Sequence, residues 1–144
     1  MGKTTRMKSW VPLALVLISA SAYGFWYQRT RGKVNKRHVT PSAPHLTAQI
    51  IGAPLGSRVT LVQFSSAFCT PCRATKFLLQ DIVSKMDDAV HVDIDAEAHL
   101  DLVRQLDIRS TPTTLILDRN GIEVGRAVGA AKREQVMAAL ESVR

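Results

Sequence analysis

The chain is poor in cysteine and, at its start, in negative charge. Only two cysteines occur among 144 residues, and no acidic residue occurs among the first 44. Because no further Cys or His stands at zinc-ligand spacing, a zinc cluster is excluded. Because the first 44 residues contain no cysteine, lipoprotein attachment is excluded as well. The chain also lacks internal repeats and low-complexity segments.

The basic charge is confined to one part of the chain. Residues 1–44 hold eight Lys or Arg, whereas residues 45–144 hold the other eleven and all twelve Asp or Glu. The net charge of +7 therefore belongs to the leader, and the rest of the chain is nearly neutral. A nucleic-acid-binding domain carries a basic patch or stripe of its own. We therefore expect no nucleic acid partner.

The leader has the pattern of a membrane-targeting segment. Trp10–Tyr27 is uncharged over 18 residues, which is near the lower limit for crossing about 30 Å of hydrocarbon. Aromatic residues lie at both of its ends, where interfacial anchors are found. We predict a single transmembrane anchor within residues 1–27. The alternative is a signal peptide with the cleavage sequence Ala20-Ser21-Ala22, which would release a secreted form. That sequence favours the extracytoplasmic face for the domain, whereas the five basic residues soon after the span, against three before it, favour the cytoplasmic face by the positive-inside rule.

Residues 28–44 are interpreted as a basic, flexible linker, since they show no apolar periodicity and include Pro41 and Pro44. The folded domain is expected over residues 45–144. His45–Ile51 fits either a short strand or a helical turn.

Apolar patterning predicts an α/β domain with the order β-α-β-α-β-β-α. Strands are expected at Val59–Phe64, Ala89–Ile94, Thr113–Leu117 and Ile122–Val128, and helices at Pro71–Met86, Glu97–Leu106 and Lys132–Val143. The first helix is expected to bury Ala74, Phe77, Leu78, Ile82 and Met86. A right-handed crossover makes the first two strands parallel, and Asn120-Gly121 predicts a final hairpin. The sheet is thus central and mixed, with helices flanking it.

The two cysteines form the motif Cys69-Thr70-Pro71-Cys72 at the junction of a strand and a helix. A helix N-terminus lowers the pKa of a thiol placed there. Cys69 is therefore predicted to be the exposed nucleophile, which forms a mixed disulfide with a substrate. Cys72, one turn further on, is predicted to be more buried and to resolve that intermediate. Two inert thiols or half of a metal site are the alternatives for such a motif.

Pro112 stands in Ser110-Thr111-Pro112-Thr113, just before the third strand, and together with the cysteine motif it points to a family. Residues 45–144 resemble a thioredoxin-family domain, and the single anchor with Cys-Thr-Pro-Cys is similar to membrane-tethered bacterial members. The resemblance implies that Pro112 is cis beside the disulfide. It also implies that the backbone of Thr111 pairs with the substrate chain, on a small surface that includes Thr70 and Gly129.

The chain departs from the family pattern behind the cysteines. Gln63 stands where thioredoxins carry a buried Asp that exchanges protons with the resolving cysteine, and His91 stands where they carry a Lys. Ser65 and Phe68 replace tryptophans. An amide cannot act as a base near neutral pH, so we hypothesise that His91, or water, takes part in a proton relay with Gln63.

The sequence thus predicts a disulfide reductase that needs no bound cofactor or metal and acts as a monomer. Pro71 before the second cysteine is typical of reducing members of the family, whereas Thr111 resembles isomerase-type members, so an oxidase or isomerase is the alternative. A copper-handling metallochaperone is a third, with His38, His45, His91 and His99 as the available histidines. The expected partners are a protein disulfide substrate, an electron donor or acceptor that the sequence does not identify, and the membrane.

Overall fold

The computed structural model describes residues 10–30, 34–36 and 45–143 of the chain. It separates into two compact units, Met1–Arg31 and Gly32–Arg144. The first contains helix α1 (Trp10–Thr30), within which the stretch Trp10–Tyr27 has a mean hydropathy of 1.4 and no buried part. In length and composition this helix fits both a membrane anchor and a signal sequence.

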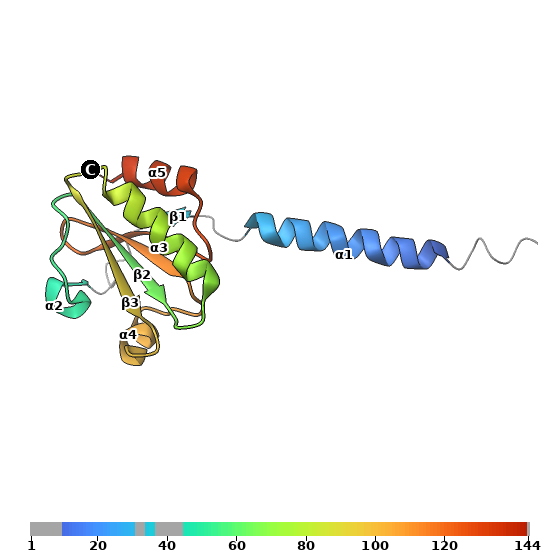
Figure 1. Cartoon of the computed structure of the whole chain (residues 1–144), viewed down its shortest axis with the longest axis horizontal. Helices are drawn as coiled ribbons and strands as arrows, with labels where there is room; N and C mark the ends of the chain where they lie inside the picture. Colours follow the sequence, from blue (N-terminus) through green and yellow to red (C-terminus); the bar gives the residue numbers. More distant parts are fainter. Residues whose placement is uncertain (1–9, 31–33, 37–44, 144) are drawn as a thin grey trace, which may run out of the picture. The chain divides into compact units, whose positions relative to one another are not determined.

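The second unit is built around one five-stranded mixed sheet with the order β1-β5-β4-β2-β3 (Figure 1). Strands β2 and β3 are parallel, and the other neighbours are antiparallel. This confirms the predicted α/β class and the parallel crossover. The strands are β1 (Val34–Lys36), β2 (Val59–Ser65), β3 (Ala89–Asp95), β4 (Thr113–Asp118) and β5 (Glu123–Val128), and the helices are α2 (Ala48–Ile51), α3 (Thr70–Val83), α4 (Leu100–Gln105) and α5 (Arg133–Glu141).

Two predictions about the start of this unit are settled by the structure. The segment 28–44 was expected to hold no ordered element, but α1 continues to Thr30 and Val34–Lys36 pair with β5 as strand β1. The pairing with a neighbouring strand supplies the hydrogen bonds that so short a polar segment needs. The remaining residues of that segment lie outside the described ranges. His45–Ile51 contains a short helix rather than a strand.

The core forms two layers, one on each face of the sheet. Helices α3 and α5 cover one face, where Val59, Leu61 and Ile116 pack against Leu79 and Leu140. Short helices α2 and α4 cover the other face, over a second cluster that includes Val62 and Phe64. The residues predicted to face inward from the last helix are buried: Val136, Ala139 and Leu140 in α5, and Val143 just after its end.

The buried stripe of α3 agrees with the predicted one in part. Ile82 is buried, and Leu78 and Met86 pack partly buried against the core, as predicted, whereas Ala74 is exposed and Phe77 is 71% exposed. The fully buried face consists of Cys72, Thr75, Leu79 and Ile82, at a spacing of three, four and three residues. Because a cysteine and a threonine begin that face, a search for large apolar residues placed the start of the stripe at Ala74 and Phe77 instead.

Arg58, just before β2, joins the start of that strand to the C-terminal end of α5. Its Nε lies 2.5 Å from Asp88 Oδ2, and its Nη1 donates to the carbonyls of Leu140 at 2.9 Å and Val143 at 3.3 Å. The carbonyls at a helix C-terminus have no partner within the helix, so a guanidinium there satisfies them. The hydrogen bond from Arg58 lowers the pKa of Asp88 from its ordinary value.

Candidate active site

The cysteine pair lies where β2 leads into α3. Cys69 is the N-cap residue of α3, and its Sγ accepts a hydrogen bond from the backbone amide of Cys72 at 3.1 Å. Cys72 is 2% exposed, whereas Cys69 is only half-buried. The two form a disulfide with their Cα atoms 5.2 Å apart. One sulfur is thus accessible and placed at free amides, while the other lies behind it, as predicted.

Thr111 and Pro112 lie on the loop that enters β4. The Thr111–Pro112 peptide bond is cis, as the resemblance implied. The Pro112 carbonyl accepts a hydrogen bond from the amide of Gly129 at 2.8 Å. The Thr111 Oγ1 lies 3.1 Å from Ser66 Oγ, on the loop that precedes the cysteines. The hydroxyl of Thr111 therefore joins the two loops.

Gln63 and His91 are brought together behind Cys72. Gln63 is fully buried, and its Nε2 donates to the Cys72 carbonyl at 2.8 Å and to Ser65 Oγ at 3.0 Å. Its Oε1 lies 3.2 Å from His91 Nε2. The amide therefore stands between the imidazole and the resolving cysteine. Both its nitrogen and its oxygen have hydrogen-bond partners, which hold the side chain in one orientation. An amide has no basic atom that could take the proton of Cys72 near neutral pH.

Comparison with known proteins decides the family. The sequence model described as thioredoxin matches residues 48–142. The chain belongs to the thioredoxin family. Thioredoxin H4-1 of Oryza sativa subsp. japonica is 30% identical over 97 residues, which cover 67% of this chain and 73% of that protein. Thioredoxin H5 of the same organism is 35% identical over 72 residues, 50% of this chain and 53% of that relative. The chain thus spans about half the length of the latter.

Solved structures agree with this assignment. Thioredoxin NaTrxh from Nicotiana alata has a TM-score of 0.55 and 28% identity to this chain, and the match covers 61% of this chain and 76% of that one. The chain therefore shares the fold of thioredoxins.

Two site features of this thioredoxin domain were missed by sequence reasoning. Ser65 Oγ lies 2.5 Å from Asp93 Oδ1, and Lys76 Nζ lies 2.9 Å from Asp93 Oδ2. They extend the contacts of Gln63 to the surface. A signal for them was present in the sequence: polar residues stand at alternate positions, 63 and 65 in β2 and 91 and 93 in β3, and the parallel register pairs Gln63 with Asp93. Alternate residues of paired strands share one face of a sheet.

His91 is half-buried on β3, and burial lowers the pKa of its imidazole, although nearby Asp93 opposes that shift. Burial therefore favours the neutral form of the ring. His91 is in contact with Gln63. A contact does not test proton transfer, so the relay role of His91 and Gln63 stays a prediction.

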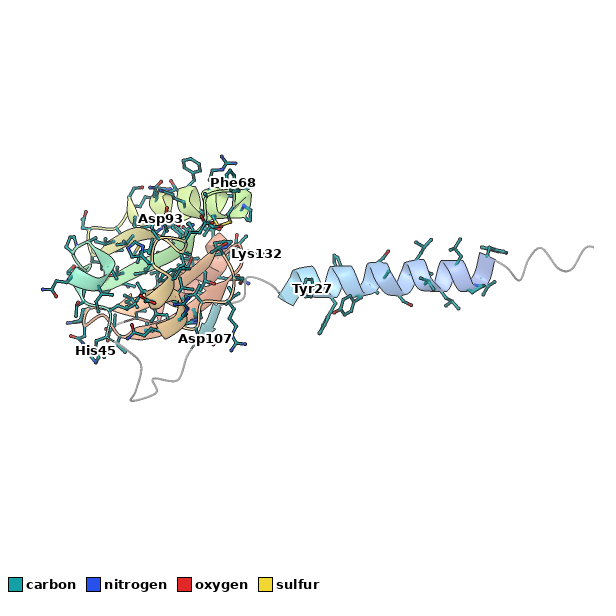
Figure 2. All side chains as sticks on the ribbon, turned by 90° about the horizontal axis from the view of Figure 1, so that it is seen from below. Tyr27, His45, Phe68, Asp93, Asp107 and Lys132 are labelled. Carbon is teal, nitrogen blue, oxygen red and sulfur yellow. A yellow bond between two sulfur atoms is a disulfide. The ribbon has the colours of Figure 1, made fainter. Side chains whose placement is uncertain are left out.

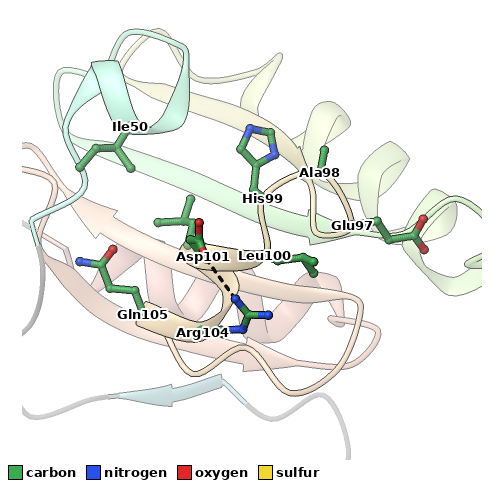
Figure 3. Close-up of a pocket in the computed structure, with 9 residues that line it drawn as sticks. Ile50, Glu97, Ala98, His99, Leu100, Asp101, Arg104 and Gln105 are labelled. Carbon is green, nitrogen blue, oxygen red and sulfur yellow. Dashed lines mark hydrogen bonds and ion pairs between the residues drawn. The ribbon is translucent and has the colours of Figure 1, made fainter.

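The surface around the thioredoxin disulfide is small and partly apolar. Phe68 is fully exposed immediately before Cys69, and Thr70 and Pro71 are exposed as well (Figure 2). A separate groove of about 550 Å³ lies at α4, between Ile50, His99 and Gln105 (Figure 3), and neither cysteine lines it. Among the described residues, no three of His, Cys, Asp and Glu are grouped as metal ligands.

Proposed function

We propose that the protein is a thiol–disulfide oxidoreductase that reduces protein disulfides through Cys69 and Cys72. The observation that carries the proposal is the arrangement of the two sulfurs. Cys69 is half-exposed at the helix N-terminus, where its sulfur accepts the amide of Cys72, and Cys72 is buried one turn behind it. A hydrogen bond to the sulfur and the helix dipole both favour the thiolate form.

The reaction proceeds in two exchanges. The Cys69 thiolate attacks one sulfur of a substrate disulfide; a mixed disulfide forms, and the substrate's other sulfur leaves as a thiolate. Cys72 then loses its proton to water and attacks the Cys69 sulfur. The Cys69–Cys72 disulfide forms, the second substrate thiolate leaves, and the substrate has gained two electrons. A separate donor of two electrons must return the pair to the dithiol.

Substrate binding is proposed at the two loops that flank the disulfide. We propose that the backbone of Thr111, next to the cis-proline, pairs with an extended substrate chain. Such pairing uses main-chain hydrogen bonds, as when a peptide adds a strand to a sheet. Phe68, Thr70 and Pro71 supply exposed contacts on the other side. We propose an unfolded or flexible protein segment that contains a disulfide as the substrate, and a monomer tethered through α1 to the extracytoplasmic face of a membrane as the acting form.

The direction of electron flow is proposed from two residues. Pro71 precedes the second cysteine, as in the reducing members that the motif resembles. The Thr111 hydroxyl, whose position resembles isomerase-type members, is engaged with Ser66 instead of a cysteine sulfur. Both observations support reduction over oxidation or isomerisation.

The test is an insulin-reduction assay of the full chain in detergent, with dithiothreitol as electron donor, together with the reduction potential of the pair. We expect turnover that Cys69→Ser abolishes, and a potential near about −270 mV. A potential near about −120 mV would assign the protein to the oxidases instead. Fusion of topology reporters at the C-terminus tests the face of the membrane.

A further inference from the structure

The polar groups behind the disulfide form one continuous chain of hydrogen bonds. This hydrogen-bond chain runs from His91 Nε2 to Gln63 Oε1 at 3.2 Å, and from Gln63 Nε2 to Ser65 Oγ at 3.0 Å. It ends at Asp93 Oδ1, 2.5 Å from Ser65 Oγ, and Lys76 pairs with the other carboxylate oxygen. Three elements contribute: β2, β3 and α3. The carboxylate of Asp93 is thus linked to a fully buried amide.

The direction of every bond in the chain follows from Asp93. A carboxylate only accepts, so the Ser65 hydroxyl donates to Asp93 and accepts from the Gln63 amide nitrogen. The second hydrogen of that nitrogen goes to the Cys72 carbonyl, 2.8 Å away. The remaining atom, Oε1, only accepts, so His91 must carry its proton on Nε2.

A reversed Gln63 amide would bring two acceptors together. Its oxygen would then face the Cys72 carbonyl oxygen, and the lost bond could not be replaced by water at a fully buried site. The chain to Asp93 opposes that reversal, because it requires a donor on the side of Ser65.

We propose that Ser65 and Asp93 are positioning residues for the resolving step. They hold the Gln63 amide so that it donates to the Cys72 carbonyl and fixes the first turn of α3, which keeps Cys72 directed at Cys69. This inference rests on the proposed use of Cys72 as the resolving thiol. It concerns the second exchange, because these hydrogen bonds reach the backbone carbonyl of Cys72, the residue that attacks in that step.

A single-turnover reaction separates the two exchanges. The reduced full chain in detergent is mixed with an aromatic disulfide, 5,5′-dithiobis(2-nitrobenzoate). The attack of Cys69 releases one coloured aryl thiolate, and the attack of Cys72 on the mixed disulfide releases the second. We expect Ser65→Ala and Asp93→Ala to slow the second release about three- to tenfold, the range for one lost hydrogen bond, while the first release stays unchanged.

Controls and a spectroscopic measurement make the test decisive. Ser65→Thr, which keeps a hydroxyl, restores the second release, and Lys76→Met, which removes only the outer ion pair, leaves it at the wild-type rate. Nitrogen-15 NMR is expected to show the proton of His91 on Nε2, and Asp93→Ala to populate the other tautomer. A wild-type second release in both alanine variants overturns the proposal, as does a proton on Nδ1 in the wild type. If insulin is not reduced while both releases occur, the proposed substrate class fails and the positioning role stands.

Discussion

Replacement of Gln63 by Glu should make the stability of the domain depend on pH. The two side chains have nearly the same shape, but a glutamate at this fully buried position faces the Cys72 carbonyl and Ser65 with one proton at most. Lys76 is already paired with Asp93, and burial disfavours the charged form of His91, the other titratable group in contact with this position, so the carboxylate gains little from a cation. Burial without a cation raises the pKa of a carboxyl by up to about 3–5 units.

The size of the effect follows from linkage. We take the pKa of the new carboxyl as about 4.3 in the unfolded chain and about 3 units higher in the folded one. Each unit of that difference corresponds to about 1.36 kcal/mol of folding free energy. The unfolded state then loses its proton first, so stability falls as the pH rises from the unfolded toward the folded pKa. Integration gives a loss of about 1 kcal/mol at pH 5 and about 4 kcal/mol at pH 8, relative to the wild type.

The assay is denaturation by urea at pH 5 and pH 8, with the disulfide intact in every sample. Gln49→Glu, at an exposed position in α2, is the matched control and should behave alike at both pH values. The reasoning is refuted if the free energy of unfolding of Gln63→Glu, relative to the wild type, changes by less than about 1 kcal/mol between the two pH values.

Three further changes test other parts of the molecule. Asp88→Asn should destabilise the domain at neutral pH, and its difference from wild type should close as the pH falls through the lowered pKa that Arg58 gives Asp88, which acid titration of both proteins measures. Thr111→Val, which breaks the bond to Ser66, should slow insulin reduction about three- to tenfold, and Thr111→Ser should not. His91→Ala should alter the pH profile of disulfide reduction below about pH 6.5, where the wild-type imidazole begins to compete for protons, and an unchanged profile rules His91 out of proton transfer.

Local patterns predicted most of the domain, because the sequence signals for most of its helices and strands lie within a few neighbouring residues. The β-branched run at Val59, the apolar spacing of α5 and the Asn-Gly turn each depend on near neighbours only. Asp118 confirms the turn, since its Oδ1 accepts the amides of Asn120 and Ile122. The family resemblance supplied the position of the cis-proline.

The features that sequence reasoning missed all depend on distant partners. Strand β1 is three residues long and exists through its pairing with β5, about 90 residues later. The bond between Ser65 and Asp93 spans 28 residues and appears only when the register of β2 and β3 is known. The exposure of Phe77 likewise depends on which face of α3 the sheet covers. A pattern search compares residues that are close in the sequence, whereas these contacts join residues that are far apart in the sequence and close in the fold.

Strand β3 is the outermost of the described strands on its side of the sheet, so none of the other described strands pairs with its outer backbone groups. An open edge of this kind invites pairing with the edge of another molecule, and charged residues discourage it. Asp93 and Asp95 place two negative charges in this strand. Asp93 therefore serves solubility as well as the active site. A protein engineer who neutralised it would change both at once, and would have to separate slower chemistry from self-association by varying the protein concentration.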